Sequence, residues 1–159
     1  MCGAFCHFVQ EYEHKMNEGE HTVLKIFLAS HGRFASGLQS SCGILLGACD
    51  NLTVFDAYVD QSTVQEHLDA FYATVEPEDE VLLCSDMYGG SVNQVMFTYL
   101  DRPNTRLVAG VNMSFMMTVL GEDAPLSDQA LDEIIQDARE CLRRVEPEGG
   151  GTSSEEDFF

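Results

Sequence analysis

Residues 23–37 read VLKIFLASHGRFASG, and this stretch decides the fold that the sequence predicts. It begins with a nearly continuous apolar run, which is typical of a strand covered on both faces of a sheet. The run stops at Ser30 and His31, and after Gly32 apolar residues recur at helical spacing. The stretch therefore predicts a buried strand that leads into a helix, with a histidine in the turn between them.

The same alternation of strand and helix continues along the chain. Nearly continuous apolar runs predict strands over Val23–Ser30, Val54–Val59, Val81–Ser85 and Leu107–Val111. Apolar residues at helical spacing follow each run. Ser62 and Gln65 form a candidate capping box after the second strand. Pro125 and Ser127 precede the clearest helix, whose apolar face extends to Val145. This alternation predicts an α/β fold, with an open, mostly parallel sheet and helices on both of its faces.

The length of 159 residues fits one domain with a segment at either end. Residues 1–21 are mixed in charge and lack a clear period, so we expect a flexible N-terminal extension there. The domain itself is expected over residues 22–145. Residues 146–159 read EPEGGGTSSEEDFF, a composition that cannot bury enough apolar surface to offset its ordering entropy, and they predict an acidic disordered tail.

Charge and composition narrow the classes of function. Eight basic residues against 27 acidic ones give a formal net charge of −19, which argues against nucleic acid or an anionic membrane as a partner and suits a basic protein. No apolar run approaches the roughly 20 residues of a transmembrane helix, and the N-terminus does not resemble a secretion signal, so we expect a cytoplasmic protein.

The six cysteines form no CxxC pair and suit reduced core thiols. Cys2, Cys6 and His7 carry metal-binding side chains, but no second ligand pair follows downstream, so we expect no metal and no other cofactor.

Polar residues stand at the ends of three predicted strands. His31 ends the first, Asp86 follows the third and is itself followed by MYGGSVN at 87–93, and Gly110 to Asn112 follow the fourth. Because the carboxyl ends of parallel strands share one edge, and ligands bind at that edge in open α/β sheets, we expect His31 and Asp86 to meet there.

This combination predicts a site for a phosphoryl group. A carboxylate at Asp86 that accepts the proton of one ring nitrogen would fix the tautomer of His31 and leave the other nitrogen as a nucleophile. Ser91 offers a hydroxyl at the start of a helix. Gly32, Gly89 and Gly90 permit close approach, and they are the candidate phosphate-binding residues. Taken singly, each of these residues also has an ordinary role in a loop or a turn.

Four stretches resemble the EIIA components of the mannose family of the bacterial phosphoenolpyruvate-dependent sugar phosphotransferase system. They are SHGRFASGL at 30–38, ILLG at 44–47, DMYGGSVNQ at 86–94 and VAGVNMSFM at 108–116, and the resemblance covers about residues 22–145. It implies that His31 accepts a phosphoryl group from the phosphocarrier HPr and passes it to the EIIB component, with Asp86 orienting the ring and Ser91 near the phosphate. It also implies indirect association with the membrane components EIIC and EIID, and a homodimer that exchanges an antiparallel strand.

Two residues depart from the family pattern. Val92 and Ser114 stand where prolines are usual, which puts the preorganisation of the local backbone and the fit to partners in question. Exposed apolar residues should mark the docking surface, and the candidates are Met87, Tyr88, Met113 and Phe115, although MSFMM at 113–117 suits a core or dimer role equally well.

Three other functions stay open at this point. They are the phosphocarrier subunit of dihydroxyacetone kinase, a non-catalytic flavodoxin-like module that binds a phosphate, and a regulatory domain that is phosphorylated as a signal.

Overall fold

The computed structural model describes residues 22–145, and its four strands form one sheet. The extension expected at 1–21, the tail expected at 146–159, and Cys2, Cys6 and His7 lie outside the described residues. The strands are β1 (Leu24–His31), β2 (Leu52–Ala57), β3 (Glu80–Ser85) and β4 (Thr105–Ala109). They are parallel throughout and lie in the order β2-β1-β3-β4, which confirms the predicted open sheet. The exchanged antiparallel strand is not among the described residues.

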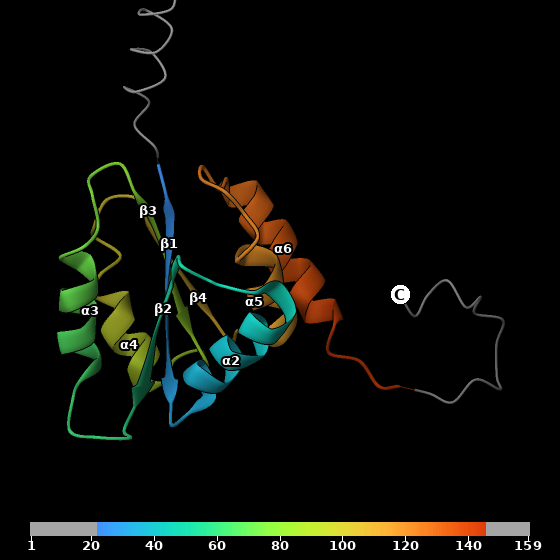
Figure 1. The fold of residues 1–159 in the computed structure, drawn as a ribbon, viewed down its shortest axis with the longest axis horizontal. Coiled ribbons are helices and arrows are strands. Elements are labelled where there is room, and N and C mark those ends of the chain that lie inside the picture. The colour runs from blue at the N-terminus through green and yellow to red at the C-terminus, as the bar shows by residue number, and fades with distance from the viewer. Residues whose placement is uncertain (1–21, 146–159) are drawn as a thin grey trace, which may run out of the picture.

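Helices cover both faces of this sheet, as predicted. In Figure 1, α3 and α4 lie to one side of the strands and α2, α5 and α6 lie to the other. The helices are α2 (Phe34–Leu46), α3 (Val64–Tyr72), α4 (Ser91–Phe97), α5 (Met113–Val119) and α6 (Asp128–Glu140). The molecule therefore has three layers, with the sheet in the middle.

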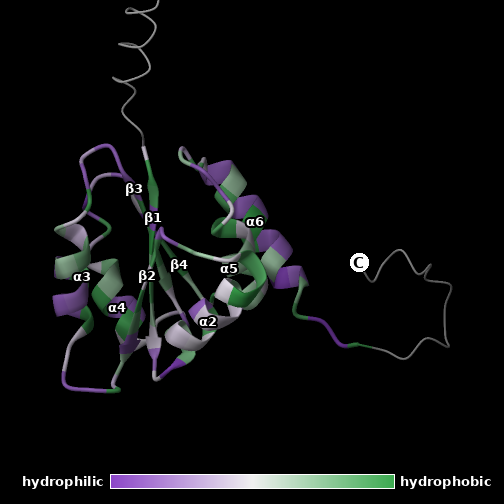
Figure 2. Ribbon diagram, in the orientation of Figure 1, coloured by the Kyte–Doolittle hydropathy of each residue, from purple (hydrophilic) through white to green (hydrophobic). Residues whose placement is uncertain are grey.

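The alternation of side chains along the strands divides the core in two. In β1, Ile26 and Leu28 pack with α2, α5 and α6, whereas Phe27 and Ala29 pack with α3 and α4. All four are fully buried, which explains why the sequence shows a continuous apolar run. Figure 2 shows the same pattern, with apolar strands between helices that have mixed surfaces. Lys25, the one charged residue in this run, forms an ion pair of 2.9 Å with Asp79.

The second strand and the helix after it differ from the prediction by a few residues. β2 ends at Ala57 rather than Val59, because Tyr58 has a φ of 67° and turns the chain out of the extended conformation. The capping box is formed by Thr63 and Glu66, not by Ser62 and Gln65: the Thr63 hydroxyl accepts from the Glu66 amide, and the Glu66 carboxylate accepts from the Thr63 amide at 2.8 Å.

The C-terminal half holds one helix that was not predicted and one that is shorter than predicted. α5 begins after Asn112, whose side-chain oxygen accepts from the Phe115 amide at 2.9 Å. Ser127 caps α6 as expected, but this helix ends at Glu140 instead of Val145. The chain between the two helices brings them together, and the Asn112 amide group donates to the Ala138 carbonyl at 2.7 Å.

Candidate functional site

His31 and Asp86 lie where the strand order of the sheet reverses. β1 and β3 are neighbours in the sheet, but the chain continues from β1 to β2 on one side and from β3 to β4 on the other. In open α/β sheets this topological switch point forms a crevice at the carboxyl edge. His31 is the last residue of β1, and Asp86 directly follows β3. The predicted meeting of the two residues at one edge is therefore confirmed.

Asp86 fixes the imidazole of His31 through two hydrogen bonds. Its Oδ2 lies 2.9 Å from Nδ1 of the ring and also accepts the backbone N–H of His31 at 2.9 Å. Because a carboxylate only accepts, Nδ1 donates to it, and in the neutral imidazole Nε2 is then the unprotonated nitrogen. The histidine side chain is 36% exposed and the aspartate side chain 17%, so the ring is partly accessible while the carboxylate is largely covered.

Ser91 stands next to the free nitrogen. It is the first residue of α4, and its Oγ lies 3.0 Å from Nε2 of His31. Since Nε2 accepts in this tautomer, the serine hydroxyl donates to it. Its hydroxyl therefore lies close to where an electrophile would approach the ring.

The loop between β3 and α4 fits closely around the histidine. A Cβ at Gly90 would lie 3.2 Å from Cε1 of His31 and 2.9 Å from the Met87 methyl carbon, so a side chain there would displace the flexible end of Met87 and crowd the ring. Gly89 has a φ of 72°, in the left-handed region that favours glycine. The turn therefore favours glycine at 89 for its backbone conformation and at 90 for the space beside the ring.

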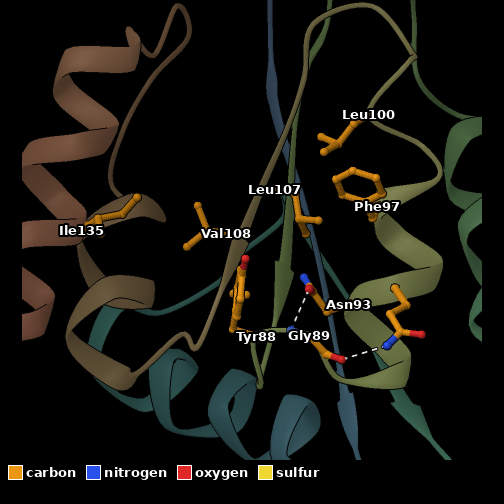
Figure 3. Close-up of a pocket in the computed structure, with 10 residues that line it drawn as sticks. Tyr88, Gly89, Asn93, Phe97, Leu100, Leu107, Val108 and Ile135 are labelled. Carbon is orange, nitrogen blue, oxygen red and sulfur yellow. Dashed lines mark hydrogen bonds between the residues drawn. The ribbon is translucent and has the colours of Figure 1, made fainter.

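Asn93 anchors the same loop to the sheet. Its side-chain oxygen accepts the Gly89 amide at 3.0 Å, and its amide group donates to the Ser85 hydroxyl at 3.1 Å. Figure 3 shows the bond between Asn93 and Gly89. Asn93 is buried, so both bonds are shielded from water. This residue was part of the quoted family motif, but its structural role was not predicted.

The glycine amides are already occupied within the chain. Gly32 donates to the Ala57 carbonyl at 2.9 Å, and Gly90 donates to the Met87 carbonyl at 3.3 Å. Together with the bond from Gly89 to Asn93, this leaves all three candidate glycines with an intramolecular acceptor. Their part in phosphate binding stays a prediction, and what the geometry shows is that they provide room rather than free donors.

The start of α2 is likewise satisfied from inside the protein. The Ala35 amide donates to the Ser30 hydroxyl at 2.7 Å, and the Ser36 amide donates to the Asp56 carboxylate at 3.0 Å. These are first-turn amides that would otherwise lack a partner. The first turn of α2 is therefore capped by residues of β1 and β2, and these amides are not free to bind a ligand.

Sequence reasoning missed Tyr58, which completes the site from β2. Its ring stacks on that of His31 with a centroid distance of 5.5 Å and an interplanar angle of 20°. Its Oη lies 2.7 Å from the Ser91 hydroxyl. Tyr58 lies beside His31 because it follows Ala57, the residue paired with His31 in the register of β1 and β2, and the sequence does not show this register. The sequence instead predicted that Tyr58 lies inside a strand.

Of the four apolar residues expected on the surface near the site, two are exposed. Met87 and Tyr88 are 53% and 88% exposed. Phe115 is buried and Met113 packs against the core, so the prediction is wrong for these two residues. The reason is α5, which directs part of MSFMM into the interior beside α2 and α6, as the core interpretation of that stretch had it.

The structure also bears on the predictions for the cysteines, for metal ligands and for membrane-spanning helices. Cys42, Cys49, Cys84 and Cys141 are free, and burial raises the pKa of the Cys84 thiol. Within residues 22–145, the structure groups no three His, Cys, Asp or Glu side chains as metal ligands. None of the helices described over the same range is long and apolar enough to cross a membrane.

Comparison with known proteins agrees with this geometry. The sequence profile of a family described as EIIA-man, PTS system fructose IIA component, matches residues 25–138. A PTS system fructose-specific EIIA component of Bacillus subtilis (strain 168) is 25% identical over 101 residues, which are 62% of this chain and 69% of that protein.

Solved structures share the fold over most of the chain. A crystal structure from Klebsiella pneumoniae subsp. pneumoniae MGH 78578, described as a permease of the phosphoenolpyruvate-dependent sugar phosphotransferase system, has a TM-score of 0.69 and 26% identity and covers 79% of this chain and 93% of its own. The mannose/sorbose-specific IIA subunit from Enterococcus faecalis has a TM-score of 0.68 and 21% identity. The match covers 82% of this chain and 100% of that subunit, and it shows a common fold. Since the family profile spans most of the domain, the chain belongs to the EIIA-man family, whose members are phosphotransfer components of the sugar phosphotransferase system.

Proposed function

We propose that this protein is a phosphocarrier that accepts a phosphoryl group from phospho-HPr on Nε2 of His31 and passes it to the EIIB component during sugar uptake. The observation that carries the proposal is the geometry of the ring: the Asp86 carboxylate lies 2.9 Å from Nδ1 and accepts its proton, so Nε2 is the unprotonated nitrogen, bonded only by the Ser91 hydroxyl. We place this activity in the cytoplasm, at the inner face of the membrane where EIIC and EIID would take up the sugar.

The transfer requires only that the protein position Nε2 for attack on phosphorus and stabilise the charge of the phosphoryl oxygens. The Nε2 lone pair forms the bond to phosphorus while the bond from phosphorus to the donor's leaving atom breaks, and that electron pair stays with the donor. Nε2 has no proton to lose, so no general base is needed. The Ser91 hydroxyl, which donates to Nε2 before the reaction, is then free to donate to a phosphoryl oxygen. Transfer to EIIB runs through the same steps with this protein as the donor.

Both partners would use one surface in turn. Met87 and Tyr88 are exposed beside the site and offer apolar contact, and the net charge of −19 favours a partner with a basic surface. Gly32 leaves the approach to the ring free of a side chain, and nothing lies within 4 Å of where its Cβ would be.

We further propose that two copies associate through the outer edge of β4. All five residues of this strand are only partly buried. A cavity of about 660 Å³ lies beside it, with Phe97 and Leu100 on one side and Ile135 on the other (Figure 3). An edge strand with unpaired backbone groups and apolar walls is a template for a further strand. An antiparallel strand exchanged from a second copy would cover the edge.

Neither the dihydroxyacetone kinase subunit nor a non-catalytic flavodoxin-like module is favoured, since the comparisons lead to EIIA components. The decisive experiment incubates the protein with phosphoenolpyruvate, enzyme I and HPr. We expect an acid-labile, base-stable phosphoryl label on the wild-type protein and none on His31→Ala. His67→Ala is the matched control, because His67 is exposed outside the site and should leave labelling intact. Label that survives in His31→Ala would overturn the assignment.

A further inference from the structure

We propose that Tyr58 binds the phosphoryl group: its hydroxyl donates to Ser91 while His31 is free, and donates to a phosphoryl oxygen once Nε2 of His31 carries the group. The inference rests on the proposed phosphocarrier function and adds the residue that follows β2 to a site otherwise built at the ends of β1 and β3 and the start of α4. It assigns a role to a side chain that neither the sequence motifs nor the comparisons single out.

The four side chains of the site form one chain of hydrogen bonds with a fixed direction. Tyr58 Oη lies 2.7 Å from Ser91 Oγ, and this oxygen lies 3.0 Å from His31 Nε2. At the other end, His31 Nδ1 lies 2.9 Å from the Asp86 carboxylate. The carboxylate can only accept, so Nδ1 donates and Nε2 accepts. Ser91 must then donate to Nε2, which leaves its oxygen to accept from the Tyr58 hydroxyl.

Phosphorylation of His31 removes the acceptor of the Ser91 hydrogen bond, which is the lone pair of Nε2. When the Nε2 lone pair forms the bond to phosphorus, the Ser91 hydroxyl loses its partner on the ring. The phosphoryl group brings three oxygens and negative charge to the same place, next to both hydroxyls. Hydrogen bonds to a charged acceptor are roughly twice as strong as those between neutral groups. The two donors therefore gain by turning to the phosphoryl oxygens, and this gain exists only in the phosphorylated state.

The conformation of Tyr58 is not explained by the stability of the fold. Its φ of 67° lies in the left-handed region, which bulky residues rarely adopt because the backbone there is strained. The side chain is 66% exposed, so it contributes little to the core. What the residue does gain is contact with the site, through its ring on His31 and its hydroxyl on Ser91. Backbone strain of this kind is concentrated at functional sites.

The test uses Tyr58→Phe, which keeps the ring and removes only the hydroxyl. The quantity to measure is the equilibrium ratio of phospho-protein to phospho-HPr, together with the forward and reverse transfer rates. A lost bond to the phosphoryl group should shift this ratio toward phospho-HPr by about fivefold to tenfold. A residue that only contacts the partner would change both rates equally and leave the ratio unchanged.

Tyr72→Phe is the matched control. It also removes a tyrosine hydroxyl, but one that bonds Thr105 at the start of β4, so the ratio should equal that of the wild type. Tyr58→Gly tests the structural alternative: it relieves the strained φ, so the protein should stay folded while the ratio shifts at least as far as in Tyr58→Phe.

An unchanged ratio in Tyr58→Phe, or a shift toward the phospho-protein, would overturn the inference. Failure of the proposed function looks different, since wild-type protein would then take no label from phospho-HPr. In that case, His31 is phosphorylated with phosphoramidate and the lifetime of the phosphohistidine is followed by 31P NMR, with His31→Ala identifying its signal. The inference then requires a shorter lifetime in Tyr58→Phe, and equal lifetimes would reject it.

Discussion

At the scale of single residues, the site works by making the two nitrogens of one imidazole different. Asp86 binds both Nδ1 and the backbone amide of His31, so neither the ring nor the strand end that carries it can turn independently. Ser91 and Tyr58 supply hydroxyls on the side of Nε2. Nδ1 is therefore the nitrogen that Asp86 holds, and Nε2 is the nitrogen at which we propose the transfer.

Replacing Asp86 with asparagine should reverse this difference. The amide group of Asn can donate to Nδ1, which moves the ring proton to Nε2 and blocks the nucleophile. We expect phosphorylation by phospho-HPr to slow on the order of 100-fold, while the free energy of unfolding changes little. Quench-flow measurement of labelling gives the rate, and 15N NMR of the imidazole gives the tautomer. An unchanged rate would show that Asp86 does not orient the ring.

Gly90→Ala tests how closely the loop fits the ring. The new Cβ would lie 3.2 Å from Cε1 of His31, so the ring must tilt slightly against the two bonds by which Asp86 holds the residue. Met87, at 2.9 Å, ends in a flexible thioether and can yield. We expect slower transfer from a tilted ring in a folded protein, measured in the same labelling assay.

The control for Gly90 is Gly43→Ala. Gly43 lies exposed inside α2 with nothing within 4 Å of its would-be Cβ. This variant should stabilise the helix by about 0.5–1 kcal/mol in urea unfolding and leave the transfer rate at the wild-type value. Equal transfer rates in the two alanine variants would mean that the close approach at Gly90 is unimportant.

At the scale of elements, α3 begins one residue later than the sequence indicates, and this difference can be measured. Thr63→Ala removes the hydroxyl that caps Glu66, and it should cost about 1 kcal/mol in the free energy of unfolding by urea. Ser62→Ala should cost less, because the Ser62 hydroxyl bonds the exposed Asp60 and no amide of the helix. The opposite order of costs would support the capping box predicted from sequence instead.

The strands and helices differ in how well the sequence pattern predicts them. β1 and β3 were found because both faces of each are buried, which leaves an uninterrupted apolar run. The seven residues of α5 were missed because MSFMMTV is apolar at almost every position and gives no helical period. His31, Asp86 and Ser91 could be placed from strand ends alone. Tyr58 could not, because only the backbone shows that β2 stops one residue before it.

At the scale of the whole molecule, the sheet has two outer edges of different character. β2 lies beside α2, whose last residues Ile44 to Leu46 are exposed, whereas β4 borders the cavity lined by Phe97, Leu100 and Ile135. The sequence resemblance implied a homodimer, and the open apolar edge of β4 is where we propose that it forms. Composition alone could not have located this edge, since it depends on the strand order.

Phe97→Glu tests the proposed dimer. Phe97 is 67% exposed in the single chain, so a charge there should not disturb folding, but it would be buried by a strand against β4. We expect the wild-type protein to sediment as a dimer and Phe97→Glu as a folded monomer in analytical ultracentrifugation. Ile44→Glu, at an exposed position on α2 away from the cavity, should stay dimeric. A wild-type monomer would contradict the proposal.

The bond between the Asp86 carboxylate and the His31 amide joins the ends of two neighbouring strands through a side chain. Rotation of the Asp86 side chain is enough to break this bond, so the ring can lose its partner while the sheet stays intact. The amide of His31 should therefore exchange with deuterium faster than that of the fully buried Leu28 in the same strand, because local opening releases it. The phosphoryl acceptance that we propose should then be lost before the secondary structure along a denaturant titration.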